Sequence, residues 1–516
     1  MRKMKRILAT VLVAALAVSC FAGCGNKKKG AAGSGANNIE IAYWNSGLGS
    51  QWLDDVKTAF EKKYPEYKVT VNATAANNAV MAAFRNEDAD TNDLYLAITD
   101  WGIDYMEPLD DILSSKADGE SKTIGEKFNP AYLELMKAED GKTYHLTYGG
   151  GGIGIVYNKE LFEEAGVRTL PRTTDELAAV CDTLASSDIK AFCHFKAQGY
   201  WEYMAQAWFM QYDGYDYFVN NFLGCTDESG TSPSKKVFTD KNGRYKALEA
   251  CEKVITNDYV LTGSNSNDHI TMQTEFLNGK AAMMVNGAWL SSEMSSIGSV
   301  EKFGVMKTPV ISSITDKLTT VKSEGDLRKV VDAVDKVTDG EAKAEDYQDG
   351  ENYNIDGLKV SAADWDYVKK ARNTNANNTS GHGAFIPKYS DAKEGAKAFL
   401  KFLYSDEGHN IFAQAVHQTL PLAADTKEVD ISAWNDFEKD IYKLTADTEQ
   451  IATDYVIARH AIFTEGGARM FCDIPFASYF CSNNVGDNKN ASQVWDEIQG
   501  RVENDYDNTW LANVSK

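Results

Sequence analysis

The sequence predicts an α/β protein made of two lobes, and three observations support this fold class. Strands and helices alternate along residues 39–98, and they alternate again along residues 154–195. The chain beyond residue 38 is also long enough to form two domains. Because strands that alternate with helices form parallel sheets covered by helices, each run is expected to build the sheet of one lobe.

The first run begins with an alternating strand at residues 39–43. A helix follows from Gln51 and ends at Pro65, because proline cannot continue a helix. Strands are expected at 68–71 and 93–98, with a short helix at 80–84 between them. The apolar residues of the first helix recur at helical spacing: Trp52, Leu53, Val56, Ala59 and Phe60.

The second run begins with a strand at 154–157 and a helix at 159–165, which Gly166 closes. Thr173 and Glu176 have the spacing of a capping box and therefore begin another helix. A strand around 191–195 completes the run. The buried face of the capped helix is predicted to carry Leu177, Val180, Cys181 and Leu184.

Residues 311–380 differ from both runs. They are acidic, rich in Asp, Lys, Asn and Gly, and poor in long apolar stretches. We expect an insertion or a surface subdomain here. Regular structure is expected to resume at 384–388, with a helix at 391–403 and a helical end near 495–502.

The first 23 residues have the features of a secretory signal, namely a basic start, an apolar run at 7–18 and a small-residue segment. An uncleaved signal anchor is the alternative, although the run is shorter than the roughly 20 apolar residues of a membrane-spanning helix. Residues 21–24, Phe-Ala-Gly-Cys, resemble the lipobox of bacterial lipoproteins, which implies lipidation of Cys24. Phe21 departs from the usual leucine, and Cys20 is a poorer candidate. Residues 24–38 would then be a flexible tether.

The composition disfavours nucleic acid as a partner. The formal net charge is -22, and removal of the signal leaves about −26 by charge counting. Such a surface repels phosphate backbones.

The cysteines beyond Cys24 match no zinc spacing, and an exported location permits disulfides without requiring them. Cys181 with Cys193 and Cys472 with Cys481 are the local pairs to test, and buried free thiols are the alternative. Six cysteines lie beyond Cys24, namely Cys181, Cys193, Cys225, Cys251, Cys472 and Cys481.

Several motifs occur in order along the chain. The most specific stretch reads DGKTY at 140–144, VYNKELF at 156–162 and EAG at 164–166. FLNGKAAM at 276–283 leads to Gly287-Ala-Trp289, and a further group lies within 396–421. With IAYW at 41–44 and the helix after it, these motifs resemble the extracellular solute-binding proteins of carbohydrate ABC importers, the family that includes maltose-binding protein. The resemblance covers the mature chain except 311–380.

The resemblance implies a periplasmic-binding-protein-like fold, in which two hinge-linked α/β lobes enclose a ligand cleft. The expected division is a signal peptide at 1–23, a tether at 24–38, a first lobe at 39–146 and 308–450, and a second lobe at 147–307 and 451–516. The acidic insertion would belong to the first lobe. A sugar or oligosaccharide ligand, ABC permease subunits as partners, and a lipid anchor on the outer face of the cell membrane are also implied. No cofactor, metal or enzymatic activity is expected.

The expected site combines rings that cover the C–H faces of a sugar with polar groups that bind its hydroxyls. Trp44 and Trp289 each follow a strand, where clefts of α/β proteins lie, and both match ligand-binding positions of the family. Core packing is the alternative for the aromatic residues, and an N-cap or turn role is the alternative for Asp100. The expected ligand-binding residues are Trp44, Asn45, Asp100, Trp101, Tyr148, Gly151, Tyr200, Trp201, Trp289 and Tyr479.

The glycine run at 149–152 is not a phosphate-binding loop, because a strand follows it instead of a helix. The family places its first crossing between lobes just before this stretch, where glycine lets the backbone approach a ligand closely. Some relatives carry a ligand-binding acid here, so the sugar specificity should differ. Alternatives to a sugar importer are the same fold binding a peptide, polyamine or metal ion, an adhesin or sensor, and a glycosidase that uses two carboxylates.

Overall fold

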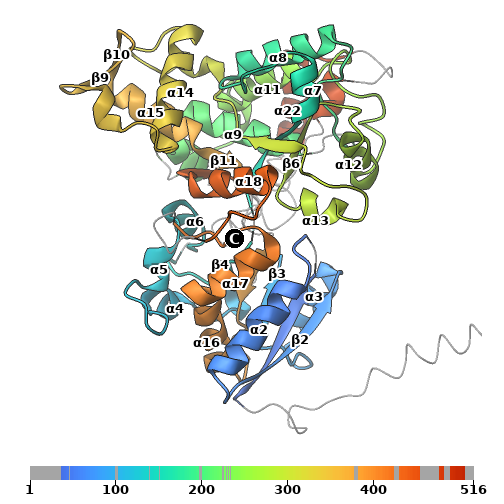
Figure 1. The fold of residues 1–516 in the computed structure, drawn as a ribbon, viewed down its shortest axis with the longest axis vertical. Helices are drawn as coiled ribbons and strands as arrows, with labels where there is room; N and C mark the ends of the chain where they lie inside the picture. The colour runs from blue at the N-terminus through green and yellow to red at the C-terminus, as the bar shows by residue number, and fades with distance from the viewer. Residues whose placement is uncertain are drawn as a thin grey trace, which may run out of the picture.

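The computed structural model describes two lobes stacked along the long axis of the molecule (Figure 1). It describes residues 36–45, 47–98, 103–138, 140–149, 151–196, 200–222, 226–227, 229, 232, 234–376, 382–423, 429–453, 476–481 and 488–505. The lower lobe contains 38–147 and 383–422, and the upper lobe contains 153–376, 436–453 and the described residues from 476 onward. The predicted two-lobed α/β fold is confirmed.

The lower lobe is built on a five-stranded sheet in the order β2-β1-β3-β12-β4. Its strands are β1 (Asn38–Trp44), β2 (Lys68–Thr74), β3 (Leu94–Ala97), β12 (Gly383–Phe385) and β4 (Leu146–Thr147). As predicted, β1 pairs in parallel with both β2 and β3, whereas β12 is antiparallel to its two neighbours. The helices of this lobe are α2 (Gln51–Lys63), α3 (Asn77–Phe84), α4 (Asp110–Ser114), α5 (Ile124–Lys127), α6 (Pro130–Leu135), α16 (Lys393–Leu403) and α17 (Asp406–Val416).

The upper lobe has a sheet in the order β13-β11-β5-β6, with β7 also paired to β5. Its strands are β5 (Ile153–Asn158), β6 (Met283–Gly287), β7 (Phe303–Met306), β11 (Thr374–Ala376) and β13 (Gln450–Ala452). Here β5 is antiparallel to β6, β7 and β11. The segment 191–195, predicted as a strand, forms only isolated bridges from Phe192 to Val260 and Met283.

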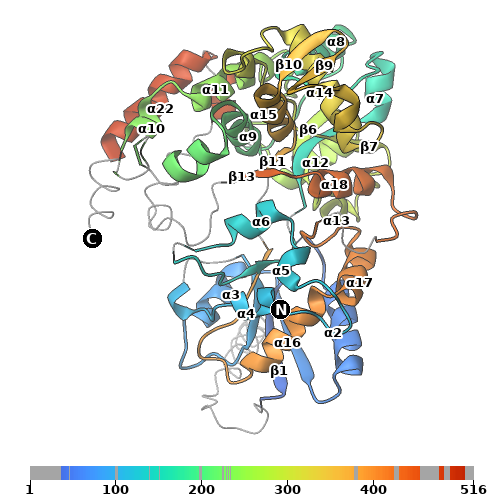
Figure 2. The same cartoon turned by 90° about the vertical axis from the view of Figure 1, so that its left-hand side faces the viewer.

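Helices cover both faces of the upper sheet (Figures 1 and 2). They include α7 (Lys159–Glu164), α8 (Thr174–Ser186), α9 (Trp201–Asp213), α11 (Gly243–Val254), α12 (His269–Leu277), α13 (Leu290–Met294), α18 (Asp436–Ala446), α21 (Phe476–Phe480) and α22 (Ala491–Asp505). Helix α8 buries Leu177, Val180, Cys181 and Leu184, the four residues predicted for its inner face. Thr173 caps its first turn, but Glu176 bonds Arg172 and so leaves the capping box incomplete.

We expected residues 308–450 to form the second part of the lower lobe, but the structure divides them between the two lobes. Helices α14 (Glu324–Thr338) and α15 (Ala362–Arg372) pack into the core of the upper lobe, and only residues 383–422 return to the lower lobe. Helix α14 is amphipathic and needs a core in which to bury Leu327, Val330, Val331 and Val334, and the core that it joins is that of the upper lobe. The small sheet of β8 (Gln348–Asp349), β9 (Asn352–Ile355) and β10 (Leu358–Ser361) joins the two helices.

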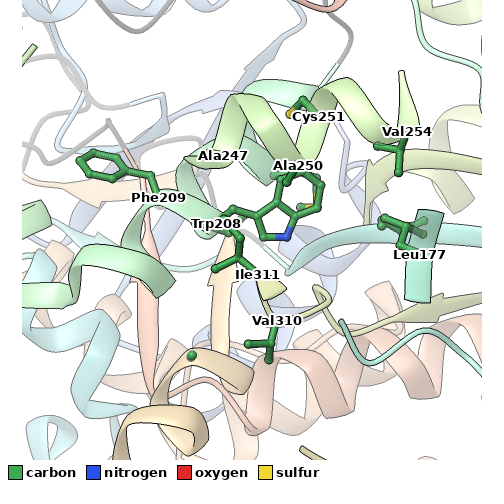
Figure 3. Close-up of a cluster of buried hydrophobic side chains, with 14 of the residues drawn as sticks. Leu177, Trp208, Phe209, Ala247, Ala250, Cys251, Val254, Val310 and Ile311 are labelled. Carbon is green, nitrogen blue, oxygen red and sulfur yellow. The ribbon is translucent and has the colours of Figure 1, made fainter. Parts of the chain in front are cut away.

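Figure 3 shows the centre of the upper core, where Trp208 of α9 packs among side chains of α8, α11 and the segment after β7. Trp208 is fully buried, and its indole N–H donates to the carbonyl of Pro309 at 3.0 Å. Cys181, Cys193, Cys251 and Cys481 are buried free thiols. The pair Cys181–Cys193 is therefore not formed, and Cys225 and Cys472 lie outside the described residues.

The buried carboxylate of Asp364, at the start of α15, holds the loop that leads into α14. It accepts backbone N–H bonds from Thr319 at 3.0 Å, Thr320 at 2.5 Å and Val321 at 3.2 Å, and hydroxyl bonds from both threonines. Burial raises the pKa of the Asp364 carboxyl, but the hydrogen bonds from Thr319 and Thr320 outweigh it and lower the pKa overall.

We expect Asp364→Asn to lower the free energy of unfolding by about 2 kcal/mol at neutral pH, because the amide nitrogen cannot accept these bonds. The folded-state pKa is lower than the unfolded one, so the contribution is present above about pH 4 and is lost as the pH falls through the folded pKa. Urea denaturation at pH 7 and at pH 3 measures both effects. A stability gap between wild type and variant that does not narrow at low pH contradicts this account.

Three crossings join the lobes: from β4 to β5, from β11 to β12, and from α17 to α18. In the first crossing the backbone approaches its neighbours too closely for a side chain. A Cβ on Gly151 would lie 2.5 Å from Cβ of Ala288, and one on Gly152 would lie 2.6 Å from Leu444. A Cβ on Gly149 would lie 2.8 Å from Leu48 of the lower lobe, so the described glycines of this run allow close contacts with both lobes. No helix within the described residues has the length and apolar character to span a bilayer.

Candidate functional site

Trp44 and His382 form a stacked pair of aromatic rings on the lower lobe. Trp44 is the last residue of β1, and its indole N–H donates to the carbonyl of Ala75 at 3.2 Å. The ring stacks on His382, which directly precedes β12, at 5.7 Å between centroids and 28° between planes. The N–H of Asn45 donates to the carbonyl of Thr74 at 2.8 Å, which fixes the turn after the strand.

Trp289 lies at the edge of the upper lobe, two residues after β6. Its ring covers Gly287, where a Cβ would lie 2.4 Å from Cζ3 of the indole, so only glycine permits this orientation. Tyr200, which precedes α9, meets the indole edge-on at 5.3 Å and 76°. Both rings are half-buried, so each combines firm packing with an accessible part.

Gly47 lies between the Trp44–His382 pair of the lower lobe and Trp289 of the upper lobe. A Cβ on this residue would lie 3.5 Å from Cβ of Trp289 and 3.9 Å from Nε2 of His382. The Gly47 carbonyl also accepts a hydrogen bond from the hydroxyl of Ser292 in α13. Trp44, Tyr200 and Trp289, all predicted from the sequence, thus belong to one set of contacts at the junction of the lobes.

Tyr148 and Gly151 support this set of contacts from the first crossing. Tyr148 is fully buried, its ring meets His382 at 5.6 Å, and its N–H donates to the His382 carbonyl at 2.9 Å. Gly151 lies against Ala288 and Gln418, and the side chain of Gln418 donates to the Ala288 carbonyl at 3.5 Å. Neither residue presents a ring face at the junction, so their contribution is to position His382 and the turn before Trp289.

The structure places the other predicted residues elsewhere. Trp201 is fully buried in the upper core, at 4.9 Å from the ring of Phe192. Tyr479 lies on α21, which packs against α22, and the Lys489 ammonium covers its ring at 4.6 Å. Asp100, Trp101 and Cys24 lie outside the described residues.

Three residues of the junction were absent from the sequence prediction: Gly47, Ser292 and His382. Gly47 has a positive φ of 74° and follows Asn45 and Ser46, residue types that favour turns. Ser292 follows Trp289 by three residues, so one helical turn places both on the same side of α13. His382 stands between two glycines just before a strand, and no local pattern distinguishes it from a loop residue.

The electrostatics of the junction favour a neutral hydroxyl at Tyr200. Burial raises the pKa of Tyr200, and the negative charges of Glu293 and Glu202 raise it further. Elsewhere in the upper lobe, burial lowers the pKa of His194 to about 4, so this imidazole is neutral at physiological pH. The described groups therefore offer rings, hydroxyls and carboxylates suited to non-covalent binding.

Two α/β lobes joined by three crossings, with aromatic side chains from both at the junction, define a two-domain binding protein. A family model for bacterial extracellular solute-binding proteins matches residues 44–410, and the chain belongs to this family. Binding proteins of Brucella abortus (strain 2308) and Brucella suis biovar 1 (strain 1330) are each 26% identical over 286 residues. These alignments cover 54% of this chain and 64% of each relative, so the chain spans less than two thirds of their length.

Solved structures share the fold over most of the chain. The solute receptor AcbH, described with an exclusive preference for β-D-galactopyranose, has a TM-score of 0.59 at 14% identity, covering 91% of this chain and 99% of its own. The GacH receptor of Streptomyces glaucescens, solved with acarbose, has a TM-score of 0.56 at 17% identity, with 90% and 98% covered. A mannobiose-binding protein of Bifidobacterium animalis subsp. lactis has a TM-score of 0.53 at 18% identity, with 91% and 95% covered.

Proposed function

We propose that this solute-binding protein captures a sugar or oligosaccharide between its lobes and delivers it to the permease of an ABC importer. The observation that carries the proposal is the meeting of Trp44 from the lower lobe with Trp289 and Tyr200 from the upper lobe through Gly47. Rings of this kind stack on the C–H faces of a sugar, and nearby hydroxyls and carboxylates bind its hydroxyl groups. The sugars named for the structural neighbours support the same class of ligand.

Binding requires no covalent step in this proposal. Each lobe contributes part of the site, so a bound solute stabilises the arrangement in which the lobes touch. Lipidation of Cys24, with residues 24–38 as a tether, would hold the protein at the outer face of the membrane near its permease. Palmitate labelling of wild type and of Cys24→Ala tests the anchor, and equal labelling of the two contradicts it.

A ligand panel tests the proposed class of solute. Purified residues 25–516 are mixed with galactose, mannobiose, diacetylchitobiose, xylobiose, maltotriose and spermidine, and thermal shift and isothermal titration calorimetry are recorded. We expect at least one neutral sugar to raise the unfolding temperature and to bind with a dissociation constant in the micromolar range or below, since binding to the folded state alone stabilises it.

Spermidine represents the second candidate class. Glu202 and Glu293 lie close enough to Tyr200 to raise the pKa of its hydroxyl, and such carboxylates would also attract a cationic solute. Binding of spermidine with no response to any sugar would replace the proposed ligand class. Turnover of a bound sugar during long incubation would contradict the absence of catalysis.

A further inference from the structure

The turn that carries Trp289 contacts the lower lobe and two of the three crossings. Ala288 lies against Gly151 of the first crossing and accepts a bond from Gln418 of the third, while Trp289 lies against Gly47 of the lower lobe. The next helix, α13, is on the side of the upper lobe that faces the lower lobe (Figure 1). Any separation of the lobes therefore changes the surroundings of this turn.

Ser292 has two acceptors within reach, and they belong to different lobes. Its hydroxyl oxygen is within hydrogen-bond distance of the Gly47 carbonyl and lies 3.2 Å from the carbonyl of Trp289 in its own turn. A serine hydroxyl has one proton to donate, so it can serve only one acceptor fully at a time. Donation to Gly47 joins the lobes, whereas donation to Trp289 stays within the first turn of α13.

We propose that Ser292 is a latch, meaning a hydrogen-bond donor that stabilises the closed arrangement of the lobes. It therefore raises the affinity for every ligand by the same factor, whatever the sugar. This inference rests on the proposed function of ligand capture between the lobes. When the lobes touch, the exposed Ser292 hydroxyl replaces the water bonded to the Gly47 carbonyl. Gly47 presents that carbonyl through a left-handed conformation, with φ at +74°, which L side chains rarely adopt.

The size of the effect follows from the exchange of one hydrogen bond. A single neutral hydrogen bond contributes about 1 kcal/mol net, which corresponds to about a five-fold change in an equilibrium constant. Because the latch acts on closure alone, Ser292→Ala should weaken the binding of every ligand by the same factor. A residue that contacted the sugar would instead change the affinities for different sugars by different factors.

The test compares Ser292→Ala, Ser292→Thr and Ser295→Ala in residues 25–516. Ser295 is an exposed neighbour whose hydroxyl donates within its own lobe, to the carbonyl of Ser292, so it controls for loss of a hydroxyl near α13. Calorimetry with mannobiose, diacetylchitobiose and galactose should show a loss of up to about five-fold for Ser292→Ala, by the same factor with each sugar that binds. Ser292→Thr, which keeps the hydroxyl, and Ser295→Ala should bind like wild type.

A second readout requires no ligand. Small-angle X-ray scattering of the unliganded proteins should give a larger radius of gyration for Ser292→Ala than for the other three proteins. Equal radii together with equal affinities overturn the latch, and so does a loss confined to one sugar. If no sugar binds, the proposed function fails while the scattering comparison still decides whether Ser292 holds the lobes together.

Discussion

Replacing Trp289 by alanine is expected to weaken sugar binding by about 30-fold or more, the largest effect of any single residue at the junction. The indole packs over Gly287, meets Tyr200 edge-on and lies against Gly47, so its orientation is fixed in the absence of ligand. Aromatic anchors in such central, firmly packed positions contribute about 2 kcal/mol or more to binding. Isothermal titration calorimetry with the best sugar of the panel measures the change.

The matched variant is Trp289→Phe, which keeps a ring over Gly287 and should retain most of the affinity. Circular dichroism and the unfolding temperature must show that both variants are folded, because Trp289 also packs against the upper core. An unchanged dissociation constant in a folded Trp289→Ala protein would remove this residue from the site and leave the proposed ligand position without its main support.

Replacing Lys127 by alanine is expected to destabilise the lower lobe by about 3 kcal/mol. Lys127 is 2% exposed, and its ammonium bonds Glu120 at 2.6 Å and Asp406 at 2.8 Å, which joins α5 to the start of α17. Removal of the cation would leave two neighbouring carboxylates, of which Glu120 keeps the bond from the Asp406 N–H at 2.6 Å but neither keeps a counter-charge at this site. A domain of this size should then unfold about 6–12 °C lower, as differential scanning calorimetry would show.

Lys336 provides the control for this prediction. Its ammonium bonds Asp332 at 2.7 Å on the surface of α14, with the two side chains 48% and 44% exposed. Solvent screens such a pair, so Lys336→Ala should change stability by less than about 1 kcal/mol. Adding Glu120→Gln and Asp406→Asn to a Lys127→Met protein should recover much of the loss. Equal effects of Lys127→Ala and Lys336→Ala would contradict the argument from burial.

Local periodicity predicted individual elements well because each pattern depends on one buried face. The spacing of apolar residues predicted the inner residues of α2 and α8, and β1 and β2 lie where strands were expected. The same pattern cannot reveal which core an amphipathic helix joins. Helix α14 has a clear apolar face, yet only the three-dimensional structure shows that this face packs in the upper lobe.

The site was predictable only where a family motif or a strand end marked it. Trp44 ends one strand and Trp289 follows another, and the structure brings both to the junction. Trp201 has the same residue type and a similar context, but its helix turns it into the core. Gly47, Ser292 and His382 acquire their roles from contacts between segments that are distant in sequence, which no local pattern encodes.

The packing of α14 and α15 in the upper lobe has a practical consequence for engineering this protein as a biosensor. Excising the acidic segment would uncover the apolar faces of neighbouring helices and favour aggregation, so this region cannot be trimmed to obtain a smaller scaffold. The β9–β10 hairpin offers a better insertion point for a fluorescent reporter. Its tip, Asp356-Gly357, is solvent-exposed, has positive φ at both residues and projects from the lobe that carries Trp289.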